Sequence, residues 1–308
     1  MKKWKAITSG ALTAALLTAF GVYSTNRLLH IQKKDEEEII RRERVAKRLN
    51  QEEFDALPKE EMTIPSAQNY PIHAYFVQPH DTKKYVVFCH GVTETKWNSI
   101  KYMNLFLKRG YNAVIYDHRR HGLSGGDTTS YGHFEKQDLK AIVDEVRHRV
   151  GEDAFIGIHG ESMGAATLLL YAGSVEDGAD FYIADCPYSD FQEQFLYRVK
   201  VDTKLNMKWL APVTDLFLKH RGGFTFKHIA PLAVVDKIYN PVLFIHSKDD
   251  DFILPSMTKA LFEKKQGEKM LYISEKGAHA QSYNENPTEY EEVIEEFLCT
   301  YVHEKEFS

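Results

Sequence analysis

This chain has few cysteines, no excess of basic residues and no internal repeats, and these absences narrow the classes of protein to which it can belong. The 308 residues include three cysteines, Cys89, Cys186 and Cys299, an odd number without the spacing of a zinc site. Two of them lie in apolar runs where buried thiols are common, so we expect free thiols. The net charge is −5 and no aromatic-interleaved basic stripe occurs, which argues against nucleic acid as a partner. No repeat or low-complexity tract follows residue 58.

The start of the chain differs in composition from the rest. After Lys2, Lys3 and Lys5, residues 6–26 carry no charge and are rich in alanine, leucine and threonine. Their number is about the ~20 residues that a helix needs to cross a bilayer, which predicts a transmembrane anchor. The first alternative is a secretory signal, but its small-x-small site at residues 19–21 is a poor cleavage signal. The second alternative is a buried helix of a soluble protein.

Flanking charges do not set the orientation of this anchor, because Arg27, Lys33 and Lys34 nearly balance the lysines before it. Its place at the start of the chain favours an amino terminus in the cytoplasm. We therefore expect a single-pass protein of the cell membrane with its main domain outside the cytoplasm. In the alternative, the protein is secreted after signal cleavage.

Residues 31–57 are densely charged, with sparse apolar residues at near-helical spacing: Ile39, Ile40, Val45 and Leu49. Pro58 ends the pattern. We expect an exposed helical stalk whose charges face solvent, so that residues 1–59 form anchor and stalk and residues 60–308 form the main domain.

The main domain has the pattern of an α/β protein. A hydrophobic share of 43% allows one large core. Short apolar runs alternate with helical stretches, which predicts a mostly parallel eight-stranded sheet with helices on both faces. The first two runs are close enough for an antiparallel hairpin. The predicted strands are 62–65, 72–77, 85–89, 112–116, 154–158, 181–185, 242–246 and 270–273.

Between the sixth and seventh predicted strands, residues 190–240 are too many for a plain crossover connection. Apolar residues such as Trp209 and Leu216 are interrupted by Pro212 and by a glycine pair at 222–223. This segment is predicted to form a helical cap over the sheet.

The sequence Gly160-Glu161-Ser162-Met163-Gly164 lies between a predicted strand and a helix predicted over 163–171. A nucleophile elbow occupies such a turn, where a strained backbone raises the serine hydroxyl above the sheet and only glycine fits on either side. A bare G-x-S-x-G match carries little information in a chain of this length. Its place between strand and helix makes Ser162 the predicted nucleophile.

A serine hydroxyl needs a general base, oriented in turn by an acid. His279 follows the last predicted strand and precedes the final helix, the loop position that suits the base. The acid is expected after the seventh strand, where Asp249, Asp250 and Asp251 are adjacent candidates.

An acyl-transfer reaction also needs amide donors for the oxyanion of its transition state. The Met163 N–H directly follows the nucleophile at a helix N-terminus and is one expected donor. The second is the Val92 N–H, in the loop His90-Gly91-Val92-Thr93 after the third strand.

These segments together resemble the α/β-hydrolase superfamily, in particular its bacterial esterase-like and serine aminopeptidase-like members. The resemblance covers about residue 60 to the C-terminus and implies the α/β-hydrolase fold. It rests on four segments: Phe88-Cys89-His90-Gly91, Tyr116 to Ser124, the elbow, and the pair of segments that hold Asp250 and His279.

The family pattern His-Gly-x-x-Asp-x-x-Val-Pro places the acid four residues after His246, at Asp250. Here Ser247 replaces the glycine and the proline arrives one residue late, so that counting back from Pro255 selects Asp251. Residues 256–257, Ser-Met, still match the family pattern after the proline. This match favours the first register, in which the acid is Asp250.

Three functions remain open. The leading one is a carboxylesterase-like serine hydrolase that cleaves an ester or related acyl bond through an acyl-enzyme. It would use Ser162, His279 and Asp250. A serine aminopeptidase-like peptidase, with a peptide as substrate, is the first alternative. A catalytically inactive, membrane-tethered binding protein is the second.

None of these functions calls for a cofactor or a metal. His118 and His121 lie beside Asp117, but no third ligand is evident, and the resemblance makes this segment a structural loop at the rim of the site. The substrate and the oligomeric state do not follow from the sequence.

Overall fold

The computed structural model describes residues 2–302, and side chains from residue 10 onwards, and within it eight strands form one sheet. The order is β1-β2-β4-β3-β5-β6-β7-β8; β2 pairs antiparallel with β1 and β4, and the other neighbours are parallel. This confirms the predicted sheet and its antiparallel hairpin. The strands are β1 (Lys59–Pro65), β2 (Pro71–Val77), β3 (Lys84–Cys89), β4 (Asn112–Tyr116), β5 (Phe155–Glu161), β6 (Phe181–Asp185), β7 (Val242–Ser247) and β8 (Lys269–Ser274).

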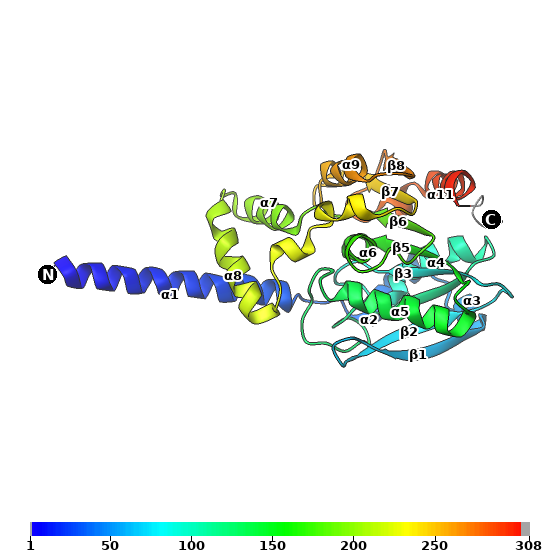
Figure 1. Ribbon diagram of the computed structural model, residues 1–308, viewed down its shortest axis with the longest axis horizontal. Helices are drawn as coiled ribbons and strands as arrows, with labels where there is room; N and C mark the ends of the chain where they lie inside the picture. Colours follow the sequence, from blue (N-terminus) through cyan, green and yellow to red (C-terminus); the bar gives the residue numbers. More distant parts are fainter. Residues whose placement is uncertain (1, 303–308) are drawn as a thin grey trace.

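Helices cover both faces of the sheet (Figure 1). Alternate residues of the central strands point to opposite faces, so Val87 of β3 packs in one apolar cluster and Phe88 in the other. Burial on both sides explains why these strands read as continuous apolar runs. One face carries α5 (Glu135–Val150), α6 (Met163–Ser174) and α9 (Pro255–Lys264), and the other carries α2 (Glu36–Val45), α3 (Gln51–Ala56), α4 (Ile100–Leu107) and α11 (Pro287–Tyr301), preceded by α10 (Ser282–Glu285).

The long segment between β6 and β7 forms the predicted helical cap. It contains α7 (Phe191–Thr203), α8 (Ala211–Gly222) and the short 3-10 helices η2 (Lys208–Leu210), η3 (Phe226–Ile229), η4 (Pro231–Ala233) and η5 (Val235–Lys237). Phe191 and Leu218 of the cap share a third apolar cluster with Met163. The cap therefore packs beside the start of α6, at the turn that carries Ser162.

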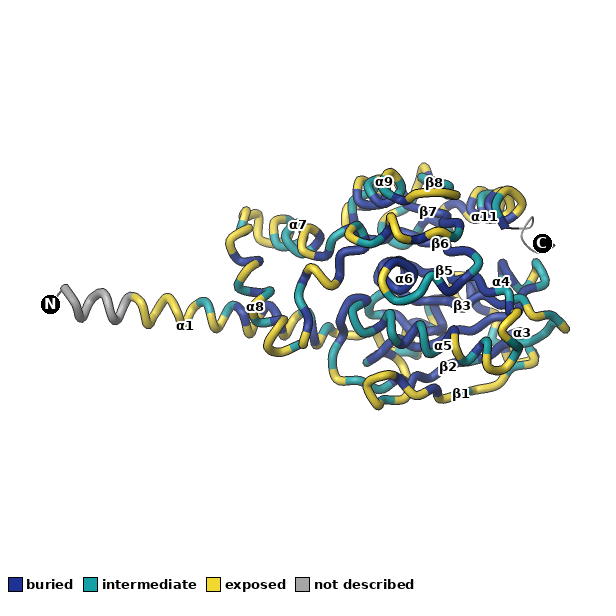
Figure 2. Tube along the Cα trace, viewed as in Figure 1, coloured by how far each residue is buried: buried dark blue, intermediate teal, exposed yellow. Residues whose placement is uncertain are grey.

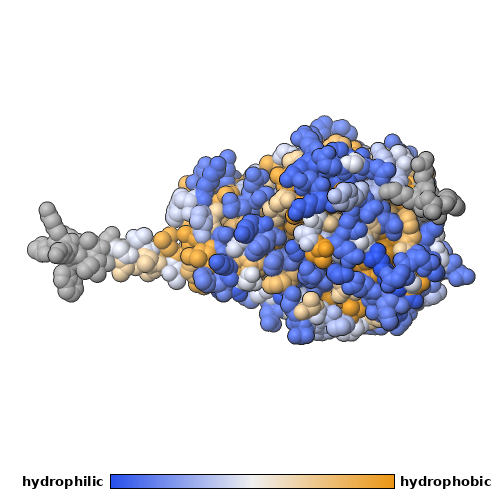
Figure 3. Space-filling model, in the orientation of Figure 1, coloured by the Kyte–Doolittle hydropathy of each residue, from blue (hydrophilic) through white to orange (hydrophobic). Residues whose placement is uncertain are grey.

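The predicted membrane anchor is wrong. Residues 6–26 lie in α1 (Lys2–Leu29), but no helix in the described part of the chain is long and apolar enough to cross a membrane. Threonine, serine and glycine dilute the alanines and leucines of α1, whose exposed stretch shows mixed hydropathy (Figure 3). Side chains of residues 6–9 lie outside the described residues. The expected placement as a single-pass protein of the cell membrane depended on this anchor and is wrong with it.

The last part of α1 packs against α8 of the cap (Figures 1 and 2). The ring of Phe217 lies where a side chain at Gly21 would project, so glycine permits the close approach. The Ser24 and Thr214 hydroxyls are 3.1 Å apart, and Arg221 donates to the Val22 carbonyl at 3.1 Å. This end of α1 is therefore part of the folded domain.

Residues 31–57 also differ from the exposed stalk predicted for them. Ile39, Leu49 and Phe54 are buried in the apolar cluster that contains α4 and α11. Glu43 is 2% exposed and pairs with Arg42 and Arg48. Ile39 and Leu49 thus belong to a packing face, whereas Val45 is exposed. The buried charge of Glu43 is paired with two arginines of the same segment.

We predict that Phe54→Ala destabilises the whole domain. The Phe54 ring packs edge-on against Trp97 at 5.2 Å and Tyr75 at 5.9 Å between centroids, so truncation leaves a cavity. Urea unfolding should show a loss of about 3–5 kcal/mol. Val45→Ala is the matched control, because Val45 is 80% exposed and should change stability by less than about 0.5 kcal/mol. Equal effects of the two changes would contradict this packing.

Candidate active site

Ser162 lies at the sharp turn from β5 to α6, with φ 56° and ψ −114°. A Cβ at Gly160 would lie 2.5 Å from the carbonyl of Gly164, and one at Gly164 would lie 2.0 Å from the carbonyl oxygen of Cys89. Both positions therefore require glycine. The Ser162 N–H donates to the Asp185 carbonyl of β6 at 2.8 Å, which fixes the turn against the neighbouring strand.

Hydrogen bonds join the three side chains predicted as nucleophile, base and acid. Ser162 Oγ lies 2.8 Å from His279 Nε2, and His279 Nδ1 lies 2.7 Å from Asp250 Oδ2. Each comes from a different loop, after β5, β8 and β7 respectively, at the carboxyl edge of the parallel strands. The order and spacing suit transfer of a proton from the serine hydroxyl to an imidazole held by a carboxylate.

Asp250, rather than Asp251, is the carboxylate that faces His279. Its Oδ1 accepts hydrogen bonds from the N–H groups of Phe252 and Ile253, at 2.9 and 3.0 Å, and its side chain is buried. Asp251 is exposed and contributes its carbonyl to the hydroxyl of Tyr197 in the cap.

His246 is a second partner of Asp250 that sequence reasoning did not assign. Its Nε2 lies 3.1 Å from Asp250 Oδ2, and its Nδ1 lies 2.7 Å from Thr258 Oγ1. Burial alone would raise the pKa of Asp250, but hydrogen bonds from His246 and His279 lower it well below its usual range. The carboxylate therefore stays charged at neutral pH. The four-residue spacing between His246 and Asp250 was visible in the sequence, but nothing there marked the pair as a contact.

We predict that Asp250→Asn and Asp251→Asn differ sharply in activity. Loss of the carboxylate that orients the base should lower kcat by about 10⁴-fold, as in the corresponding triad substitution. Asp251→Asn should leave kcat near that of the unmodified protein. Steady-state hydrolysis of a soluble ester measures both, and the reverse result would assign the acid to Asp251.

An apolar pocket of about 220 Å³ lies on one side of Ser162. Met163 and Val92, the residues predicted to supply amide donors, both line it. Met163 is the first residue of α6, so its N–H has no partner within the helix. Five aromatic side chains line the pocket as well: Tyr131, Tyr188, Phe191, Phe195 and Phe252. The other lining residues are Leu28, Ile31 and Ile253 and the polar Arg27, Gln194 and Arg198.

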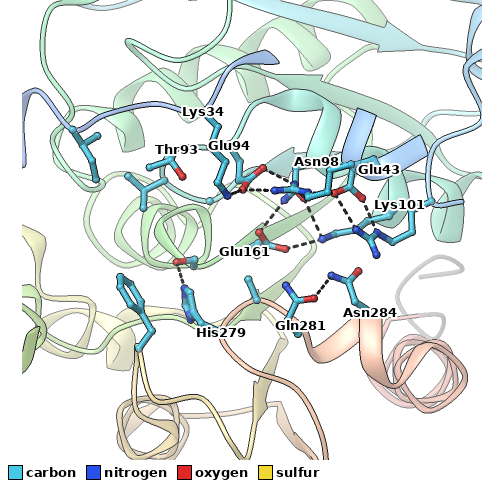
Figure 4. A pocket seen from close by; sticks show the side chains of 18 residues that line it. Lys34, Glu43, Thr93, Glu94, Asn98, Lys101, Glu161, His279, Gln281 and Asn284 are labelled. Atoms are coloured by element: carbon cyan, nitrogen blue, oxygen red, sulfur yellow. Dashed lines mark hydrogen bonds and ion pairs between the residues drawn. The ribbon is translucent and has the colours of Figure 1, made fainter. Parts of the chain in front are cut away.

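Ser162 also lines a second pocket of about 390 Å³, whose other lining residues are mostly charged or polar (Figure 4). Ser162, Val92, Phe252 and Ile31 line both pockets, so the serine stands at their boundary. One wall of the polar pocket comes from the amino-terminal segment that was expected to be a stalk: Lys34, Arg42, Glu43 and Arg48.

Glu161, the residue before Ser162, is buried and lines this pocket. Its carboxylate accepts a hydrogen bond from Tyr102 at 2.7 Å. It also accepts one from Asn98 at 2.9 Å and pairs with Lys101 at 3.2 Å (Figure 4). Sequence reasoning left Glu161 unassigned and missed its partners, because they lie about 60 residues away in a helix that carries no motif.

His118 and His121 belong to the support of the loop after β3. Both are buried, and burial lowers the pKa of each imidazole, to about 3 for His121. His121 Nε2 accepts from the Thr93 N–H at 3.2 Å, while the His118 N–H donates to His90 Nε2 at 2.9 Å. These contacts fit the structural loop that the resemblance implied.

One group of metal-ligating atoms occurs among the described residues. It comprises Cys186, Asp250 and His279, whose ligand atoms all lie within 4.8 Å of one another. Burial raises the pKa of the Cys186 thiol well above its usual value, and Asp250 and His279 already bond to each other. A protonated thiol is a poor ligand, so this set does not fit a metal centre.

Comparisons with known proteins agree with this architecture. A family model described as serine aminopeptidase, S33, matches residues 80–222. An esterase of Pyrococcus furiosus, Pf2001, superposes with a TM-score of 0.67 at 22% identity, over 82% of this chain and 97% of that chain. An acylaminoacyl peptidase of Pyrococcus horikoshii gives a TM-score of 0.60 at 18% identity, over 81% of this chain and 43% of that one.

The chain therefore has the α/β-hydrolase fold, and the family match over residues 80–222 supports a hydrolase of the esterase and peptidase type. At the level of sequence it is similar to the uncharacterized protein YqkD of Bacillus subtilis. The two are 51% identical over 290 residues, which cover 94% of this chain and 95% of that protein.

Proposed function

We propose that this protein is a serine esterase that hydrolyses small carboxylic esters through an acyl-enzyme. The observation that carries the proposal is the continuous set of hydrogen bonds from Ser162 through His279 to Asp250, at 2.8 and 2.7 Å. Ser162 Oγ attacks the ester carbonyl while His279 Nε2 takes the hydroxyl proton. Asp250 holds the imidazole and stabilises its charged form.

The carbonyl oxygen becomes an oxyanion, which the N–H groups of Val92 and Met163 bind. His279 then gives its proton to the leaving alcohol oxygen as the carbon–oxygen bond breaks. Water attacks the resulting acyl-Ser162 ester, His279 removes a proton from that water, and the acid is released with the Ser162 hydroxyl restored.

Two observations favour an ester over a peptide with a free amino terminus. The pocket beside Ser162 and the two proposed donors is almost wholly apolar, which suits an acyl chain. Recognition of an amino terminus would need an available carboxylate, and the carboxylates lining the polar pocket already accept bonds or ion pairs. Their partners are Arg42 and Arg48 for Glu43, Arg42 and Lys34 for Glu94, and Asn98, Tyr102 and Lys101 for Glu161.

A fluorophosphonate probe tests the nucleophile. It should label the purified protein at Ser162, because the activated hydroxyl attacks phosphorus and the adduct resembles the tetrahedral intermediate. Ser162→Ala should not be labelled, whereas Ser189→Ala, a change at another buried serine, should be. Mass spectrometry locates the adduct. Labelling that persists in Ser162→Ala would place the nucleophile elsewhere.

A substrate panel tests the bond and the acyl group. We expect hydrolysis of p-nitrophenyl esters to be fastest with short and medium acyl chains, because the apolar pocket of about 220 Å³ is small. Aminoacyl anilides should react far more slowly. Preference for an anilide with a free amino group over every ester would instead support the peptidase function, and absence of all turnover would support a binding protein.

A further inference from the structure

The loop that carries Val92 contains a strained residue. Thr93 has a positive φ of 70°, which a β-branched side chain adopts only when its surroundings impose it. Its N–H donates to His121 Nε2 at 3.2 Å, and its carbonyl accepts from the backbone N–H of Lys34 at 3.2 Å. The amino-terminal segment, residues 31–48, thus holds one side of this residue.

Glu94, the next residue, ties the same turn to that segment more strongly. Its carboxylate accepts two bonds from the guanidinium of Arg42, at 3.0 and 2.7 Å, and also contacts Lys34 Nζ (Figure 4). Burial would raise the pKa of Glu94, but Arg42 and Lys34 lower it to about 2. Glu94 is therefore charged at neutral pH, and this buried charge is compensated by Arg42, with two hydrogen bonds, and by Lys34.

Arg42 is itself fixed from several directions. Its Nε donates to Glu43 at 2.8 Å, and Nη2 also donates to Asn98 Oδ1 at 3.2 Å. Asn98 donates in turn to Glu161 at 2.9 Å, beside the nucleophile. A Cβ placed on Gly91 would lie 3.3 Å from the Glu161 carboxylate, so the turn rests directly on this residue. A continuous polar network therefore joins α2 to both sides of the proposed oxyanion site.

We propose that Arg42 is a positioning residue for catalysis. Through its paired bonds to Glu94 it holds the turn 91–94 so that the Val92 N–H points at the developing oxyanion. The inference rests on the proposed function, because it needs Val92 as a donor. Arg42 lies outside residues 80–222, the part matched by the family model.

Kinetics of Arg42→Ala, with Arg44→Ala as control, test this role. Arg44 lies on the same helix but is exposed. Deleting an oxyanion donor costs about 10²–10³ in kcat, so displacing one should lower kcat by about 10- to 100-fold while KM changes little. Arg42→Lys should restore part of kcat, because lysine keeps the charge but not the two parallel bonds. Arg44→Ala should match the unmodified protein.

Two further readouts separate positioning from general loss of structure. The affinity for a trifluoromethyl ketone, which forms a tetrahedral oxyanion, should fall in Arg42→Ala by the same factor as kcat/KM. Glu94→Gln should lower kcat in the same way, and the double variant should lose no more than Arg42→Ala alone, since the two residues act as one unit.

The proposal is overturned if Arg42→Ala keeps the kcat of Arg44→Ala, or if kcat falls while ketone affinity is unchanged. Should Arg42→Ala fail to fold, as judged by near-ultraviolet circular dichroism, Arg42→Lys and Glu94→Gln decide by the same criteria. Failure of the proposed function looks different, because the unmodified protein would then neither react with fluorophosphonate nor hydrolyse any ester.

Discussion

The candidate site depends on the close approach of α6 to the end of β3, which is possible only because position 164 has no side chain. A Cβ there would lie 2.0 Å from the Cys89 carbonyl oxygen. This contact brings the N-terminus of α6 against the loop after β3, so that Met163 and Val92 come to line the same pocket. It also leaves Ser162 no room for a relaxed backbone, and the positive φ of 56° follows. The positions of Ser162 and of the proposed donors are therefore set together by one packing constraint.

Buried charge is the second constraint. The carboxylates of Asp250 and Glu161 are both buried, and each is paired with nearby donors. Asp250 is compensated by His246, His279 and two backbone N–H groups, and Glu161 by Tyr102, Asn98 and Lys101. Buried ion pairs contribute little net stability, because desolvation offsets their attraction, but breaking one leaves an uncompensated charge. Such groups therefore act chiefly to fix geometry, which is what a site for acyl transfer requires.

The sequence was sufficient to predict those features of the fold and the site that are formed by adjacent residues. The strands are runs of apolar residues, the elbow is five adjacent residues between a strand and a helix, and His279 follows the last strand; none of these needs knowledge of a distant partner. The structure places His279 beside Ser162, and it separates Asp250 from Asp251, which spacing alone left open.

The errors have a different origin. Composition suggested an anchor and an exposed stalk for residues 1–59. Whether such segments are exposed or buried, however, depends on the surfaces that they pack against. Ile39 and Phe54 meet a surface built by α4 and α11, and Arg42 meets Glu94, 52 residues away. No local pattern carries such information. Charged residues with sparse apolar neighbours describe a solvated helix and a docked one equally well.

Ser162 lines two unlike pockets, which bears on the substrate of the proposed esterase. Under the proposed function, the carbonyl carbon that Ser162 attacks would carry one substituent in the apolar pocket and the other in the polar one. In the polar pocket a cationic group would have to displace Arg42, Arg48 or Lys101 from a carboxylate that is already neutralised. That exchange gains little and costs the desolvation of the incoming charge. A neutral polar leaving group meets no such cost, so the proposed esterase function favours an ester with an apolar acyl part and an uncharged, hydrophilic alcohol.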